Sequence, residues 1–188
     1  RGPIPGGGVS TELTQHHDCL PTLLAAAGDT TCMERLKKGT TVNGRKYKNH
    51  IDGFNFLPHL TGETKEGPRK WFFYFSDDGD VLGLRWQNYK IVFMEQRCQG
   101  TLQVWAEPFT VLRCPKIFNL RTDPFERADV TSNTYWDWYF HHCFFIYGAA
   151  AAVAKFMETF EEFPPAQKPG TFTADQAMQK MTEVQGAS

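Results

Sequence analysis

The order of apolar and polar residues predicts a small antiparallel sheet in the middle of the chain. Four segments rich in aromatic and β-branched residues have strand character: 71–76, 81–86, 89–96 and 116–120. Asp78-Gly79 is a turn signal between the first two segments, and Gln87-Asn88 turns the second into the third. The fourth segment follows a long loop, 97–114. We therefore expect a meander of about four strands.

Residues 11–28 predict a strand followed by a helix. Residues 11–15 have the length of a strand, and Asp18 can cap a helix that carries Pro21 in its first turn. Gly28 supplies the C-terminal stop. Four apolar residues share one face of this helix: Leu20, Leu23, Leu24 and Ala27. One or two helical turns are expected at 33–38, and residues 1–8, with Pro3 and three glycines, read as a connector.

A long helix is expected after the sheet. Asn133 or Thr134 can cap it, and Pro164-Pro165 stops it after Phe163. Its first half is apolar or aromatic on almost every side, but histidines interrupt the run and it falls short of the roughly 20 apolar residues of a membrane span. We expect no membrane span, and a helix packed on several sides. Residues 172–181 predict a last short helix.

Composition narrows the choice of partners. The 188 residues carry 20 basic and 21 acidic side chains, so a net charge of −1 gives no electrostatic reason to expect nucleic acid or an anionic membrane as a partner. Sixteen phenylalanines indicate more packing surface than an isolated domain of this size needs. The chain starts at Arg1 without a signal segment, and we expect it to lie within a longer or processed gene product.

Three phrases, in this order, resemble the end of the formylglycine-dependent sulfatases of the alkaline phosphatase superfamily. They are D-G-F-N-F-L-P-H-L-T-G at 52–62, W-F-F-Y-F-S-D-D-G-D-V-L-G-L-R-W-Q-N-Y-K-I-V-F at 71–93, and K-I-F-N-L-R-T-D-P-F-E-R-A-D at 116–129. The resemblance extends upstream through 10–28 and covers nearly the whole chain. It implies that residues 1–62 are the tail end of the α/β catalytic domain and a connector, and that 63–188 form the C-terminal subdomain.

The implied fold is α+β: an antiparallel sheet of about four strands with a long flanking C-terminal helix, preceded by the strand–helix piece. The implied function is that of a C-terminal fragment of a sulfuric ester hydrolase, inactive alone. The resemblance also leaves open the tail of a phosphonate monoester hydrolase or phosphodiesterase. A stand-alone packing or oligomerisation module is a third hypothesis. An exported parent would place the chain in the periplasm or outside the cell.

The nucleophile of the family is expected outside this chain. It derives from the cysteine of C-x-P-x-R, which is oxidised to formylglycine. Cys19-Leu20-Pro21-Thr22-Leu23 comes nearest, but the fifth position is Leu23, which cannot donate hydrogen bonds to a sulfate ester. No other cysteine here has proline two residues later followed by arginine. We therefore expect no catalytic residue in this chain.

No metal site is expected here either. The family's calcium ligands are implied to lie in the N-terminal domain. The acidic cluster Asp77-Asp78-Gly79-Asp80 is explained by a hairpin tip. The adjacent pairs His16-His17 and His141-His142 cannot chelate one ion, because neighbours on a helix point about 100° apart. His50 and Asp52 share one face if the chain is extended there, but two ligands make no site.

Two further expectations concern the loop after the third strand. Four residues offer polar or stacking groups at the rim of a substrate pocket: Arg97, Gln99, Gln103 and Trp105. The hairpin tip at 76–80 is a second rim candidate, and the alternative is that the loop merely covers the sheet. Cys98 and Cys114 stand at the two ends of the loop, where an antiparallel return predicts a disulfide if the protein is exported; two unpaired thiols are the alternative. Expected partners are the missing catalytic domain or a second copy of the chain, and a sulfate ester for the complete enzyme.

Overall fold

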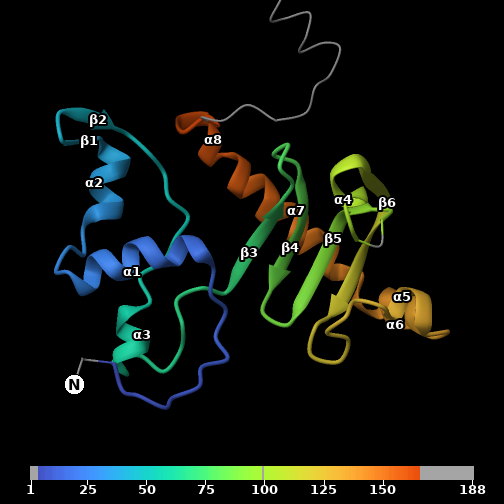
Figure 1. The fold of residues 1–188 in the computed structure, drawn as a ribbon. Helices are drawn as coiled ribbons and strands as arrows, with labels where there is room; N and C mark the ends of the chain where they lie inside the picture. The colour runs from blue at the N-terminus through green and yellow to red at the C-terminus, as the bar shows by residue number, and fades with distance from the viewer. Residues whose placement is uncertain (1–3, 99, 166–188) are drawn as a thin grey trace, which may run out of the picture.

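The protein has an α+β fold, with a four-stranded antiparallel sheet flanked by helices (Figure 1). The computed structural model describes residues 4–98 and 100–165. The helix expected at 172–181 lies outside the described residues. The described part divides into an N-terminal unit, residues 10–62, and the sheet with the helices that follow it.

The sheet consists of β3 (Trp71–Phe75), β4 (Val81–Trp86), β5 (Tyr89–Gln96) and β6 (Phe109–Asn119), in that spatial order. The predicted meander is therefore confirmed. Short turns join the first three strands, and Phe72 lies opposite Arg85, which lies opposite Lys90. Because side chains alternate across a sheet, these residues share one face.

The fourth strand is longer than predicted, because it begins at Phe109 and not at Lys116. Its first part pairs with the end of β5, with Gln96 opposite Phe109, across a bulge between Val92 and Met94. Pro115 lies at the level of this bulge, where a proline without an N–H can be tolerated within a ladder. The remaining loop contains one helical turn, α4 (Gln103–Ala106).

The C-terminal helix is bent and divided. It consists of α6 (Tyr135–His142), α7 (Phe144–Met157) and α8 (Thr159–Glu162), preceded by the short α5 (Ala128–Thr131). The expected long C-terminal helix is confirmed, and it bends at Cys143, where the axis turns by 56°. The Nδ1 atom of His142 lies 2.7 Å from the carbonyl oxygen of Trp138, and a side chain inserted into the helical ladder is a recognised cause of a kink.

The length and hydropathy of the helices can be compared with those that a membrane span requires. Among residues 4–98 and 100–165, no single helix is long and apolar enough to cross a membrane, whereas the bent pair of α6 with α7 and α8 meets the criterion by length and composition.

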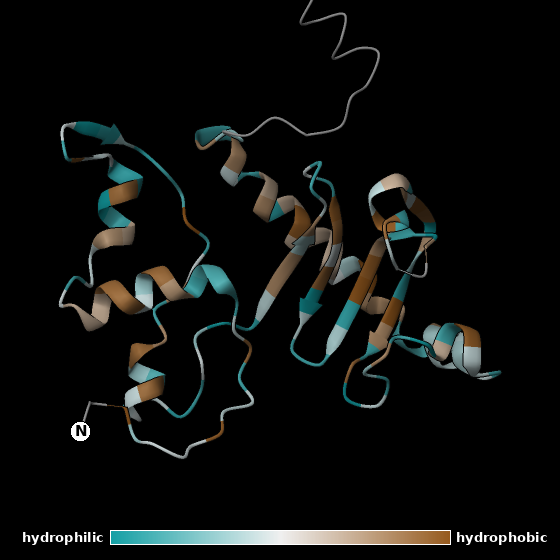
Figure 2. Ribbon diagram, in the orientation of Figure 1, coloured by the Kyte–Doolittle hydropathy of each residue, from teal (hydrophilic) through white to brown (hydrophobic). Residues whose placement is uncertain are grey.

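The helices cover one face of the sheet and one of its edges. Ala149 of α7 packs with Leu84 and Ile91. Tyr135 and Tyr139 of α6 form a second core with Ile117 and Phe118 of β6. Figure 2 shows that the ribbons of β5, β6 and α7 include apolar stretches. Both tyrosine hydroxyls have hydrogen-bond partners. The hydroxyl of Tyr135 donates to the carbonyl of Ile117 at 3.0 Å, and that of Tyr139 donates to the carbonyl of Pro115 at 2.9 Å.

The N-terminal unit lies beside the β3 edge of the sheet (Figure 1). It contains η1 (His16–Asp18), α1 (Cys19–Ala26), α2 (Cys32–Lys38), the hairpin β1 (Thr40–Val42) and β2 (Arg45–Tyr47), and α3 (Leu57–Thr61). The helices expected near 18–28 and 33–38 are confirmed. The strand expected at 11–15 is absent from the described structure, because that segment has no neighbouring strand with which to share backbone hydrogen bonds. Asn43 and Gly44 both have positive φ, as a two-residue hairpin turn requires.

Candidate functional site

The hairpin tip and the loop after β5 meet in a pocket of about 540 Å³. Trp105 of α4 stands on one side and Ser76 of the tip on the other. The lining is completed by apolar, acidic and amide side chains: Phe75, Asp77, Asp78, Leu82, Gln96, Val104, Glu107, Pro108 and Phe109. The structure places together the two segments that the sequence offered as rim candidates, and their role at a substrate pocket stays a prediction.

Hydrogen bonds hold the two walls of this rim pocket in position. The side-chain amide of Gln96 donates to the carbonyls of Val104 and Glu107, each at 2.6 Å, and so fixes the α4 turn to the end of β5. The hydroxyl of Ser76 accepts from the backbone N–H of Asp80 at 3.0 Å and closes the tip. The acidic tip therefore has the structural explanation that the sequence offered.

The chemistry of the rim pocket disfavours an anionic ligand group. Trp105 is 80% exposed, so its ring is free to stack on a flat or apolar surface. Carboxylates and amides in the lining accept hydrogen bonds from hydroxyl groups. None of the lining residues is Lys, Arg or His. A sulfate group would find no positive partner here.

The other predicted rim residues lie outside the lining of this pocket. The amide of Gln103 donates to the Oε1 atom of Glu107 at 3.3 Å. Arg97 follows the end of β5 and does not line the cavity. Gln99 lies outside the described residues. Sequence reasoning missed Glu107 and Phe109, since both lay in a stretch read as loop.

The two cysteines at the ends of the loop are not joined. All five cysteines are free: Cys19, Cys32, Cys98, Cys114 and Cys143. The predicted Cys98–Cys114 disulfide is wrong, because β6 starts five residues before Cys114 and carries it away from the end of β5. Cys114 instead lies 2.8 Å from the hydroxyl of Tyr139.

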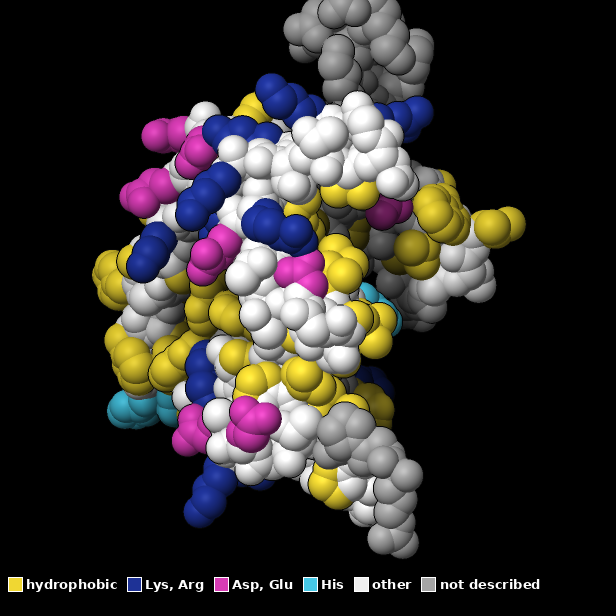
Figure 3. Space-filling view, turned by 90° about the vertical axis from the view of Figure 1, so that its left-hand side faces the viewer, with side chains coloured by type: hydrophobic (Ala, Val, Ile, Leu, Met, Phe, Trp, Pro, Cys, Tyr) yellow, Lys and Arg dark blue, Asp and Glu magenta, His cyan; other side chains and the backbone are white. Residues whose placement is uncertain are grey.

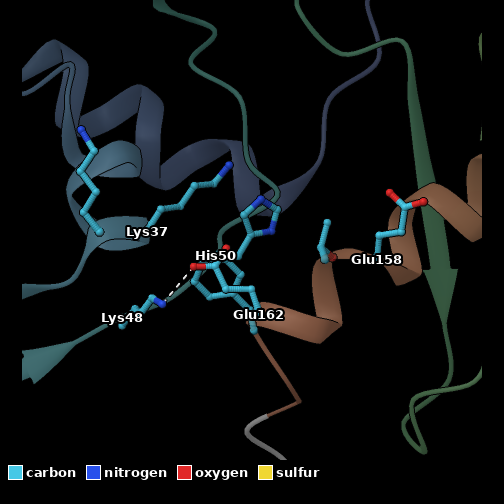
Figure 4. A pocket seen from close by; sticks show the side chains of 8 residues that line it. Lys37, Lys48, His50, Glu158 and Glu162 are labelled. Atoms are coloured by element: carbon cyan, nitrogen blue, oxygen red, sulfur yellow. Dashed lines mark ion pairs between the residues drawn. The ribbon is translucent and has the colours of Figure 1, made fainter.

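A second pocket lies between the N-terminal unit and α8, with a volume of about 580 Å³ (Figure 4). Lys37, Lys48 and His50 lie on one side and Glu158 and Glu162 on the other. Lys48 pairs with Glu162 at 2.9 Å across the gap. This pocket is therefore bridged by its own opposite charges.

The surface around this second pocket has no field of one sign. Figure 3 shows basic and acidic side chains interspersed over the face of the N-terminal unit. The predicted proximity of His50 and Asp52 is confirmed, with the Nδ1 atom 3.2 Å from a carboxylate oxygen. Within the described residues, no group of three or more His, Cys, Asp or Glu side chains is arranged to hold a metal ion.

A buried ion pair ties the N-terminal unit to the sheet. The side chains of Asp18 and Arg69 are 4% and 2% exposed and make two hydrogen bonds, at 2.8 and 2.5 Å. Asp18 also accepts from the backbone N–H groups of Gln15 and Phe54, both at 2.8 Å. Arg69 donates in addition to the carbonyl of Asp52 at 2.8 Å. The side chain of Asp18 makes no capping hydrogen bond to α1, so its predicted capping role was wrong.

Burial by itself raises the pKa of Asp18. The hydrogen bonds from Arg69 and from the backbone of Phe54 and Gln15 outweigh burial, so the pKa of Asp18 lies below its ordinary value. The carboxylate is therefore held ionised. Its full set of partners indicates a structural role.

Comparison with known proteins places these features in a family. The model of the C-terminal region of aryl-sulfatase matches residues 67–186, which is more than half of the chain. Among solved structures, the PsFucS1 sulfatase from Pseudoalteromonas sp. is similar, with 21% identity and a TM-score of 0.61. The match covers 88% of this chain and 30% of that one. No curated protein matches. The family match and the four-stranded sheet with its C-terminal helix agree: the chain belongs to the family of aryl-sulfatase C-terminal regions.

Proposed function

We propose that this chain is the non-catalytic C-terminal part of a sulfatase and that it shapes the rim of the substrate pocket. One observation carries the proposal: the family match spans the sheet and the helices after it, while the 188 residues contain no C-x-P-x-R sequence. Hydrolysis of the sulfate ester then depends on residues outside this chain.

The residues present do not fit the cofactors of the family. Cys19 lacks the arginine four positions later, and Leu23, which stands there, is 67% exposed on α1. The hydroxyl of Ser76 and the backbone of the tip engage one another, which explains the acidic cluster without an ion. We therefore expect formylglycine and calcium to belong to the catalytic domain, and we derive no chemical step through them.

The catalytic domain is the partner that this function requires. In the proposed enzyme, the N-terminal unit is the end of that domain, and the Asp18–Arg69 pair fixes the sheet to it. A buried, hydrogen-bonded ion pair sets the relative position of two units more precisely than exposed pairs do. If either side chain moved away, the other would remain as a buried charge without a counter-ion. The rim pocket would thereby keep a fixed place beside the active site.

The rim pocket supports a role in binding the organic part of the ester. Its exposed tryptophan and hydrogen-bond acceptors suit an uncharged ring or hydroxyl-bearing group, and the lack of cations in its lining disfavours the sulfate. Binding energy from a part of the substrate remote from the reaction lowers KM when it acts equally on ground and transition states.

Trp105→Ala in the complete enzyme tests this role. Loss of a stacking contact worth about 1 kcal/mol should raise KM about fivefold and leave kcat within about twofold, because only binding is removed. Leu102→Ala is the matched control: Leu102 precedes α4, is 82% exposed and does not line the pocket, so its KM should not change. A large fall in kcat at constant KM would place Trp105 at the reaction instead.

The same kinetic comparison separates the enzyme alternatives. Assays on an aryl sulfate and on an aryl phosphonate should show preference for the sulfate if the parent is a sulfatase. Preference for the phosphonate would favour a phosphonate monoester hydrolase.

A further inference from the structure

The outer side of α6 and α7 carries an exposed aromatic stripe, which we define as Trp136, Phe140, Phe144 and Tyr147. Their spacing of four, four and three residues follows the helical repeat, and Cys143 between the two helices keeps helical dihedral angles. The four side chains are 52, 72, 59 and 80% exposed. Soluble monomers rarely expose apolar patches larger than a few hundred Å².

The two sides of this layer differ in their chemistry. On the face of the sheet opposite α7, Lys90 pairs with Glu126 at 2.8 Å, and Lys116 pairs with Glu95 and Asp129. That face therefore carries paired charges, beside the buried side chains of Phe72 and Phe118. The helices, in contrast, contain one charged residue between 136 and 154, Asp137. The helices therefore carry an exposed apolar surface with little charge.

We propose that the aromatic stripe is the contact through which two copies of this chain pair. Four aromatic side chains of about 150–250 Å² each, exposed by half to four fifths, present roughly 500 Å². With the small residues beside them, such as Gly148 and Ala151, this approaches the roughly 800 Å² per partner of a standard interface. Interface cores are rich in aromatic residues and poor in charge.

A second copy fits this surface better than other occupants do. When two aromatic stripes pack antiparallel, no like charges are brought together. In a two-fold symmetric dimer both copies use the same surface patch, so the stripe of one copy contacts the stripe of the other. The helix α6 lies beside the β6 end of the sheet, whereas α1 to α3 lie at the β3 end (Figure 1). Helices that lie on lipid surfaces usually carry Lys or Arg on their polar face, and residues 136–154 contain neither.

Sedimentation equilibrium of the 188-residue chain, from about 5 to 100 µM, tests the pairing. The wild type should sediment with twice the 21.5 kDa mass of the chain. Phe140→Glu should weaken the dimer at least about 100-fold, because a charge would be buried at its centre. Phe125→Glu is the matched control: Phe125 is 81% exposed but lies in the turn after β6, so the dimer should persist. If Phe140→Glu alters the far-UV circular dichroism, Tyr147→Glu replaces it.

Mixing variants identifies the contact itself. In an antiparallel pair centred between Phe140 and Phe144, Phe140→Glu of one copy faces position 144 of the other, so mixing it with Phe144→Lys should restore a dimer that neither variant forms alone. A wild type that remains monomeric at 100 µM would overturn the proposal. So would equal effects of Phe125→Glu and Phe140→Glu, or wild type that binds phosphatidylcholine vesicles through the stripe without self-association.

Discussion

Asp18→Ala is expected to lower the free energy of unfolding by about 3–5 kcal/mol, the cost of breaking a buried ion pair by removing one partner. The substitution leaves the Arg69 guanidinium buried without its counter-ion and leaves the backbone N–H groups of Gln15 and Phe54 without their acceptor. Urea denaturation followed by circular dichroism measures the loss. Lys70→Ala is the control, since the exposed Lys70–Glu66 pair lies one residue further along the chain and should contribute little. Equal effects of the two substitutions would contradict the assigned role of Asp18.

Acidification should remove the same stabilisation. The folded-state pKa of Asp18 lies below the ordinary value of 3.8, so the folded protein binds this proton less tightly than the unfolded chain does. The contribution is therefore fully present above pH 3.8 and is lost as pH falls through the lower folded-state pKa. The stability difference between wild type and Asp18→Asn, measured by urea denaturation, should shrink in that range. A difference that stays constant down to the folded-state pKa would show that the charge of Asp18 is not involved.

Gly53→Ala is expected to cost about 3 kcal/mol or more, at the upper end of overpacking effects. A Cβ atom at position 53 would lie 2.1 Å from the carbonyl oxygen of His17 and 3.0 Å from Pro21, and backbone within η1 cannot yield to it. Thermal unfolding should show a correspondingly lower midpoint. Gly148→Ala is the matched control with the opposite sign: a Cβ there meets nothing within 4 Å in α7, and Gly→Ala within a helix stabilises by about 0.5–1 kcal/mol. A Gly53→Ala variant as stable as wild type would show that the two loops do not approach this closely.

The sheet could be predicted because its strands and turns are specified by residues that are close together in the sequence. Alternating aromatic and β-branched residues with two short turns between them determine both the strands and their order, so β4 and β5 have the predicted bounds. The start of β6 could not be predicted in the same way. Cys114-Pro115 reads as the end of a loop, and only pairing with Met94–Gln96 across a bulge makes 109–114 a strand.

The features missed by sequence reasoning depend on contacts that are distant along the chain. Asp18 looks like a helix cap, and its partner Arg69 stands 51 residues away. At Gly53, the absence of a Cβ leaves room for the backbone carbonyl of His17, which is distant along the chain. The bend at Cys143 arises within a helical pattern that holds no proline or glycine near this position to mark it.

The lining of the pocket between the hairpin tip and the loop could be predicted only in part. The meander predicted that the tip at 76–80 and the loop after β5 would lie at one end of the sheet, and Trp105 does line the pocket between them. The directions of the side chains within the loop could not be predicted from the sequence. Gln96 holds the loop through the backbone carbonyls of Val104 and Glu107, and a backbone carbonyl is present at every position whatever the residue type. Gln103 consequently turns to Glu107 and away from the pocket.

We propose that these residues belong to a sulfatase but do not perform its chemistry. The most direct measurement is the turnover of a chromogenic aryl sulfate by the purified 188-residue chain, verified by mass. We predict a rate equal to that of a heat-inactivated control, because neither a C-x-P-x-R cysteine nor, within the described residues, a metal-binding group is present. Turnover above that control would contradict the account.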